Sequence, residues 1–150
     1  MAATMSIVDT AVLPAHGGRT HLRAAHTGGT IGIAEAAFPP GYAVHWHTHT
    51  REDETFHVVR GCFRFWSGDE VTDAGPGSVI FAPRHIRHRW QNIGESDGQL
   101  LFILTPGGFE SFFDDLAALP DVTPEAIFAL EASYGVSSEI LNGTTPPPSS

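Results

Sequence analysis

The feature that most constrains this 150-residue chain is a group of histidines and a glutamate set at fixed distances from glycines. From Gly41 the order is five residues, His47, one residue, His49, four residues, Glu54, six residues and Gly61. His47 and His49 lie two positions apart, so a strand through them points both side chains to one face. A strand that returns after a short charged turn would bring Glu54 beside this pair on the same sheet face.

A second group of the same kind begins at Gly77, 36 residues after Gly41. Gly77 is followed by five residues, Pro83, one residue, His85, two residues, His88, three residues and Asn92. A third imidazole from this group, together with the first two and the carboxylate, would form a nitrogen and oxygen ligand set that suits first-row divalent metals. The sequence therefore predicts a site for one divalent metal ion, with the ligands His47, His49, Glu54 and His88.

Short apolar stretches separated by turns recur through the first two-thirds of the chain. The 16 glycines and 11 prolines supply many turn positions. We expect strands over residues 20–25, 30–38, 42–50, 54–60, 62–66, 77–82, 87–92 and 99–105. Many short strands at this spacing predict an all-β sandwich or barrel. Ligands from three of these strands would converge inside it.

The two glycine- and histidine-containing segments resemble the paired motifs of the cupin superfamily, G-x5-H-x-H-x4-E-x6-G and G-x5-P-x-G-x2-H-x3-N. The first motif matches at every defined position, and the second departs only at His85, where the pattern has glycine. The wider stretch 27–113 resembles small single-domain cupins (monocupins) that are described as quercetin-dioxygenase-like, most clearly over 51–54 and 105–113. The resemblance implies an all-β cupin fold, that is, a double-stranded β-helix or jelly-roll barrel.

The chain divides into four expected parts. Residues 1–19 form an N-terminal arm with one strand near 7–13, and residues 20–106 form the barrel. Residues 107–135 form a short C-terminal helical extension, in which Thr123 caps a helix that ends at Gly135. We expect these helices to pack on the outside of the barrel or against a partner, without a role in chemistry. Residues 136–150 form a disordered tail.

Apolar and aromatic residues dominate the remaining strands. A cavity between them would hold a flat, largely apolar or aromatic small molecule, with the metal as its polar anchor. The resemblance implies a metal-dependent dioxygenase that cleaves a carbon–carbon bond in a flavonol-like, aromatic or enolic compound. Its metal would be iron, manganese, nickel, cobalt or copper, and Glu54 would act both as ligand and as catalytic proton acceptor.

Two other functions remain open. With zinc as a Lewis acid, the same ligands would suit a non-redox polyketide cyclase or isomerase. His45 or His85 would then be the catalytic base. His45 has the strand parity of the ligating pair and either faces the cavity or lies in water at its rim. His85 lies in the loop before His88, either at the cavity mouth or without a role. The third function is a non-catalytic small-ligand-binding protein.

Composition excludes several other classes of protein. Eight basic and 17 acidic residues give a net charge of −9, which argues against a nucleic-acid-binding surface. No apolar run approaches membrane-spanning length, no secretory signal is visible, and one cysteine excludes an internal disulfide. We expect a cytoplasmic location, and the sequence leaves open a homodimer formed through a sheet edge or the C-terminal helices. Strand alternation along 87–92 predicts that Arg87 and Arg89 face solvent.

Overall fold

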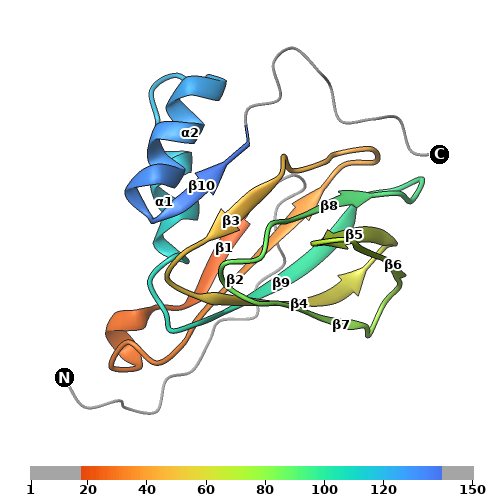
Figure 1. The fold of residues 1–150 in the computed structure, drawn as a ribbon, viewed down its shortest axis with the longest axis horizontal. Helices are drawn as coiled ribbons and strands as arrows, with labels where there is room; N and C mark the ends of the chain where they lie inside the picture. Colours follow the sequence, from red (N-terminus) through yellow and green to blue (C-terminus); the bar gives the residue numbers. More distant parts are fainter. Residues whose placement is uncertain (1–17, 140–150) are drawn as a thin grey trace.

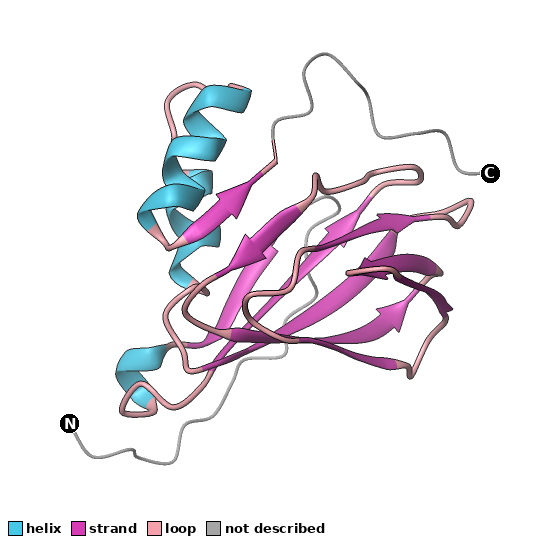
Figure 2. Cartoon of the chain, in the orientation of Figure 1, coloured by secondary structure: helices cyan, strands magenta, loops and turns pink. Residues whose placement is uncertain are grey.

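The computed structural model describes residues 18–139, which form two five-stranded antiparallel sheets with two helices at one side (Figures 1 and 2). The strand order of the first sheet is β1 (Gly18–Leu22), β2 (Gly32–Phe38), β9 (Gly98–Thr105), β4 (Asp53–Arg60) and β7 (Val79–Ala82). The order of the second is β10 (Val136–Ser138), β3 (His47–His49), β8 (His88–Asn92), β5 (Phe63–Ser67) and β6 (Glu70–Ala74). A 3-10 turn, η1 (Ala24–His26), joins β1 to the loop before β2. The prediction of an all-β barrel with a short helical extension is confirmed.

The core lies between the two sheets and follows the alternation of each strand. In β4 and β9 every second residue is buried, among them Phe56, Val58 and Leu100, each with an exposed fraction of 0%. Complete burial of one such side chain stabilises a fold by roughly 1.5–3 kcal/mol. Phe63 and Trp90 pack from the second sheet onto this layer. This two-sided core holds the sheets at a fixed separation, so side chains pointing inward from both can meet.

The last glycine of the first motif turns the chain from β4 into β5. Gly61 has a φ of 87°, and a Cβ atom added there would lie 2.8 Å from the Cα of Gly98. Both the positive φ and this close approach require glycine. The turn carries the chain from the first sheet into the second.

The predicted strand over 42–50 is much shorter than expected. Only His47–His49 form β3, while Ala43 makes an isolated bridge to Gln91. The chain then crosses between the sheets, because β3 pairs with β8 whereas β4 pairs with β9 and β7. The prediction that a hairpin places Glu54 on the same sheet as the histidine pair is therefore wrong.

The C-terminal extension contains α1 (Ser111–Ala117) and α2 (Pro124–Ser133), as the sequence predicts. The Thr123 hydroxyl accepts a hydrogen bond from the backbone N–H of Ala126 at 3.1 Å, so the predicted cap is present. Beyond α2, Gly135 adopts a φ of 76°. Figure 1 shows both helices stacked beside β10, at the side of the sheets away from β6 and β7.

The predicted tail begins inside a strand rather than in a disordered segment. Val136, Ser137 and Ser138 form β10 and pair with all three residues of β3. Val136 is buried, so its side chain anchors the strand, but three residues are too few to produce a strand pattern in the sequence. The remaining tail, and the strand predicted near 7–13, lie outside the described residues.

Two other boundaries differ from expectation. β1 begins at Gly18, so the last residues of the predicted arm belong to the first sheet. β6 was not predicted, because four of its five residues are exposed and its sequence shows little apolar alternation. Within residues 18–139, no helix has the length and apolar character that crossing a membrane requires.

Candidate metal centre

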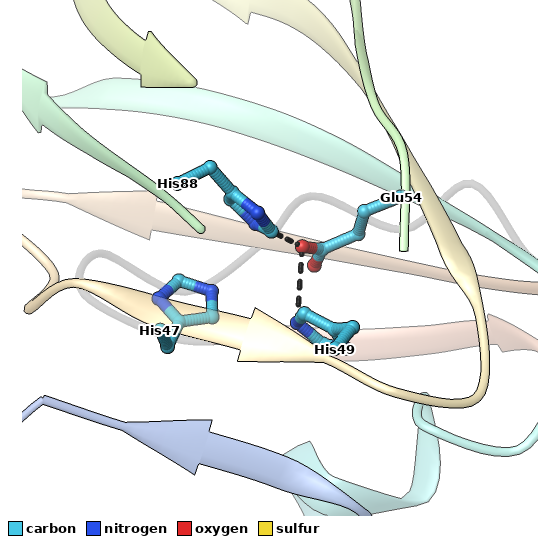
Figure 3. Close-up of side chains that lie close together, drawn as sticks. All are labelled: His47, His49, Glu54 and His88. Carbon is cyan, nitrogen blue, oxygen red and sulfur yellow. Dashed lines mark hydrogen bonds and ion pairs between the residues drawn. The ribbon is translucent and has the colours of Figure 1, made fainter. Parts of the chain in front are cut away.

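The four predicted ligands meet in the space between the sheets (Figure 3). Each offers one donor atom, and these atoms all lie within 4.8 Å of one another. All four side chains are buried. The quartet, as we call it below, consists of His47, His49, Glu54 and His88.

Strand register explains how the quartet forms. His47 lies directly opposite His88 in the β3–β8 pair, and His49 points to the same face two residues further along β3. These three imidazoles belong to the second sheet. Glu54 reaches them from β4 in the first sheet, next to Phe56 on the same inward face.

Each of the three imidazoles has a protein oxygen near its Nδ1 atom. Nδ1 of His47 lies 2.8 Å from the carbonyl oxygen of His45, and Nδ1 of His49 donates to the carboxylate of Glu52. Nδ1 of His88 lies 3.4 Å from the carbonyl oxygen of Ile86, a longer contact. An oxygen at Nδ1 favours the tautomer that carries its proton there, which leaves Nε2 free as a ligand atom.

Two of the Nε2 atoms lie close to the carboxylate of Glu54. Oε2 of Glu54 lies 2.9 Å from Nε2 of His88 and 3.2 Å from Nε2 of His49, as the dashed lines in Figure 3 mark. The contact to His49 does not have hydrogen-bond geometry, so this buried nitrogen lacks a hydrogen-bond partner. An unsatisfied buried polar atom is costly. A divalent metal ion would satisfy it, and the three nitrogens and one carboxylate fit a first-row metal.

Burial and the charges of neighbouring groups shift the pKa values of the quartet residues in different directions. Burial alone would raise the pKa of Glu54, but His49 and His88 outweigh it and hold that pKa well below its usual range. Burial alone would lower the pKa of His49, but Glu54 and Glu52 raise it to about 10. Burial, reinforced by His88, lowers the pKa of His47 to about 3. A metal would therefore meet a neutral His47 and displace a proton from His49.

A cavity of about 560 Å3 adjoins the quartet, and its largely apolar wall contains several aromatic rings. Among them are Phe38, Tyr42, Trp90, Phe102, Phe109 and Phe112. Burial raises the pKa of Tyr42, so its hydroxyl stays protonated and can donate a hydrogen bond. A second hollow of about 690 Å3 lies between β6 and β7, but no quartet residue lines it.

The C-terminal helices form part of this cavity wall. Phe112 and Leu116 of α1, with Ile127 and Glu131 of α2, are among the lining residues. We expected these helices to have no part in the site, yet these four residues line the cavity. The physical reason is that β10 pairs with β3, which carries two quartet residues and draws the helices across the opening.

His45 is among the residues that line the cavity, and its side chain is partly exposed. Its Nε2 lies 2.9 Å from Oε2 of Glu131. Glu131 is buried, with an exposed fraction of 6%, and sequence reasoning missed it. The available signal was an acidic residue four positions after Ile127, on the apolar side of a helix.

The structure does not bring His85 to the cavity. Its side chain is exposed and is not among the lining residues, so the expected catalytic role has no geometric support. Its φ of 69° explains why the motif has glycine at this position. His57 alternates with Glu54 and Phe56 along β4 and points to the opposite face, as predicted.

Comparison with known proteins identifies the domain. A model of the cupin domain matches residues 34–104, a range that contains the whole quartet. The chain contains a cupin domain. As a cupin it is similar to three curated proteins. It is 30% identical over 87 residues to protein SchB of Streptomyces halstedii, and 30% over 109 residues to the quercetin 2,3-dioxygenase of Aspergillus japonicus. It is 28% identical over 89 residues to the polyketide synthase CurC of Streptomyces cyaneus.

The matched segment covers 58% of this chain for SchB, 69% for the dioxygenase and 59% for CurC. They cover 62% of SchB, 29% of the dioxygenase and 58% of CurC, less than two-thirds of each relative. Solved structures agree on the fold alone. A predicted oxalate decarboxylase from Thermotoga maritima is 20% identical with a TM-score of 0.59, covering 67% of this chain and 99% of that one. KdgF from Halomonas sp. is 22% identical with a TM-score of 0.55, covering 61% and 78%.

Proposed function

We propose that this cupin is a metal-dependent dioxygenase that cleaves a carbon–carbon bond in a flavonol-like, aromatic or enolic small molecule. The observation that carries the proposal is the convergence of three imidazole donor atoms and one carboxylate beside a cavity that contains several aromatic rings. Similarity to a quercetin 2,3-dioxygenase supports the choice of reaction.

Each part of the site has a role in this proposal. The quartet would hold iron, manganese, nickel, cobalt or copper, which would activate an enol or phenol oxygen of the substrate and bring it together with dioxygen. Glu54 would accept the substrate hydroxyl proton at Oε2, the atom that faces His88 and His49. The aromatic walls would bind a flat ring system and exclude water from the reacting oxygen.

The test measures metal content and oxygen consumption together. Protein purified without a metal-affinity tag, from cells grown in a mixed-metal medium, is analysed by mass spectrometry and then given flavonols in an oxygen electrode. We expect stoichiometric redox metal and flavonol-dependent oxygen uptake. Metal-loaded protein that consumes no oxygen with any flavonol or aromatic enol would contradict the proposal.

A second candidate is a zinc-dependent, non-redox polyketide cyclase or isomerase. Similarity to a polyketide synthase, CurC, favours it, and the same cavity would accept a folded aromatic precursor. Zinc in the purified protein, with product formed under anaerobic conditions, would support this candidate. Zinc binds N/O sites strongly, so its presence alone is weak support. Affinity for a flavonol with no turnover under either condition would indicate the third function, a binding protein.

The cytoplasmic location and the homodimer remain predictions. Val79 and Phe81 on β7 are exposed large apolar residues at an edge of the first sheet, and we propose this edge for chain pairing. Analytical ultracentrifugation of wild type and of Phe81→Glu measures whether the chains pair and whether pairing depends on this edge. A monomeric wild-type protein at high concentration would overturn the pairing.

A further inference from the structure

A second polar group lies in the cavity wall, outside the quartet. The carboxylate of Glu131 in α2 is buried, and its Oε2 accepts hydrogen bonds from Nε2 of His45, at 2.9 Å, and from Oγ of Ser138. A buried carboxylate is costly unless it is hydrogen-bonded. An apolar side chain would fill this position in the cavity wall equally well, as Ile127 does one helical turn earlier. The presence of a carboxylate therefore calls for a reason other than packing.

The contact with Glu131 fixes one side of the His45 ring. Because Nε2 is held by the carboxylate, Nδ1 is the ring nitrogen that remains for a ligand. Within residues 18–139, the side-chain hydrogen bond that the structure shows for His45 runs through Nε2 and not through Nδ1. Phe128 packs edge-on against the ring, with 5.0 Å between centroids, and holds its plane. The ring is thus oriented by the protein on one side and available to a ligand on the other.

His45 also stands next to the quartet. Its ring centroid lies 5.7 Å from that of His47, and both side chains line the same cavity. The backbone carbonyl of His45 is the oxygen that orients Nδ1 of His47. One residue therefore orients a predicted metal ligand through its backbone and presents its own side chain to the cavity.

We propose that His45, positioned by Glu131, binds a substrate hydroxyl that neighbours the metal-binding oxygen of the same molecule. The inference rests on the proposed function in one respect, since it takes the substrate oxygen to be held at the quartet. It adds the substrate class, which is planar aromatic or enolic molecules with at least two oxygen groups on one edge. One of these oxygens faces the quartet and the next is hydrogen-bonded to Nδ1 of His45. Glu131 is a positioning residue, because it acts through His45.

The experiment compares two coloured three-ring probes that differ by one hydroxyl group, 1-hydroxyanthraquinone and 1,8-dihydroxyanthraquinone. Both offer a carbonyl and a neighbouring hydroxyl to the metal, and only the second has another hydroxyl on the same edge. Trp90 lines the cavity, so quenching of tryptophan fluorescence reports binding. The quantity measured is the ratio of the two dissociation constants for metal-loaded protein.

Four variants test the role of each group. We expect His45→Leu and Glu131→Leu to reduce the preference for the dihydroxy probe by about tenfold, the worth of one hydrogen bond. Glu131→Gln should retain most of the preference, because its amide oxygen still accepts from Nε2 of His45. Glu125→Gln is the matched control, since it removes a charge from the exposed first turn of the same helix. A purely structural role for Glu131 would lower the melting temperature without changing the ratio.

The remaining outcomes are decisive as well. An equal ratio in wild type and His45→Leu overturns the proposal, as does failure of metal-loaded wild type to bind either probe. Loss of metal from His45→Leu also overturns it, because the residue would then act on the quartet. If Glu131→Leu does not fold, His45→Leu and Glu131→Gln carry the test. The assay uses no oxygen chemistry, so failure of dioxygenase activity would refute the proposed function and leave this ratio unaffected.

Discussion

Glu52 and His49, three residues apart in the sequence, form a buried pair in which the carboxylate accepts a hydrogen bond from Nδ1 of the ring. Glu52 belongs to a charged run that resembles an ordinary solvated turn, yet its exposed fraction is only 4%. The pair turns Nε2 of His49 toward Glu54. A carboxylate behind a ligating imidazole fixes the tautomer and strengthens the nitrogen as a donor.

Replacing Glu52 with glutamine should weaken metal binding by roughly 10- to 100-fold, the usual effect of losing such a partner. Competition titration against a chelator of known affinity measures the change. Glu95→Gln removes one charge at an exposed site and should leave the affinity unchanged. Equal affinities in wild type and Glu52→Gln would mean that this hydrogen bond does not tune the ligand.

Removing the metal should lower the melting temperature. A ligand that binds only the folded state adds about 2.7 kcal/mol at a concentration one hundred times its dissociation constant. For a domain of this size that corresponds to a shift of roughly 5–10 °C. Calorimetry with and without a chelator measures it. An unchanged melting temperature in protein shown to contain metal beforehand would count against a site at the quartet.

The fourth ligand can be tested with a matched pair of histidine variants. His88→Ala should lose bound metal and most metal-dependent activity while it remains folded, because one imidazole has gone. His57→Ala, whose side chain points to the opposite face of β4, should keep both. Metal analysis and circular dichroism are run on the two in parallel. Full metal content in His88→Ala would remove that residue from the ligand set.

The metal-free protein should be most stable near about pH 6.5 and lose stability on both sides. Below that value the unfolded chain binds a proton at His47 that the folded state refuses until about pH 3, so stability falls as the pH drops. The raised pKa of His49 stabilises the fold fully below about 6.5, and this contribution disappears as the pH rises through about 10. The lowered pKa of Glu54 stabilises the fold above its unfolded value of 4.5 and is lost on further acidification.

Urea unfolding in the presence of a chelator, at several pH values, measures this profile. His47→Gln should flatten the acid limb between about pH 6.5 and pH 4 relative to wild type. An acid limb of the same slope in His47→Gln would mean that other groups cause it.

His85→Gly should raise the free energy of unfolding by about 0.5–1 kcal/mol. A histidine held at a φ of 69° carries a backbone cost of roughly 1–3 kcal/mol, part of which is offset by the greater freedom of glycine in the unfolded chain. Because the side chain is exposed and outside the cavity, activity should not change. Chemical denaturation gives the stability, and a large loss of activity would restore His85 as a catalytic residue.

The ligand set could be predicted because it depends on local spacing. Residues two apart on a strand share a face, and the glycines that bound each motif fix where the turns fall. Strand pairing is different, since parity along one strand does not say which sheet the next strand joins. The position of Glu54 opposite His47 and His49, across two sheets, therefore came only from the structure.

Features that depend on contacts between residues far apart in the chain could not be predicted from the sequence. Alternation predicts a solvent-facing Arg89, yet the residue is 2% exposed and its guanidinium lies 4.4 Å over the ring of Trp66. Burial lowers its pKa. Glu131 enters the cavity only because α2 folds back over the opening. The helix pattern places Glu131 on the apolar side of α2, but it does not say which surface that side covers.

The strands and the C-terminal helices contribute different parts of the cavity. β3, β4 and β8 carry the four donor atoms, whereas α1 and α2 provide much of the facing wall. Substitutions in the helices can reshape the space offered to a guest molecule while the donor atoms stay where the strand register sets them. Amino-acid substitutions after residue 110 would therefore alter substrate specificity while leaving metal specificity unchanged.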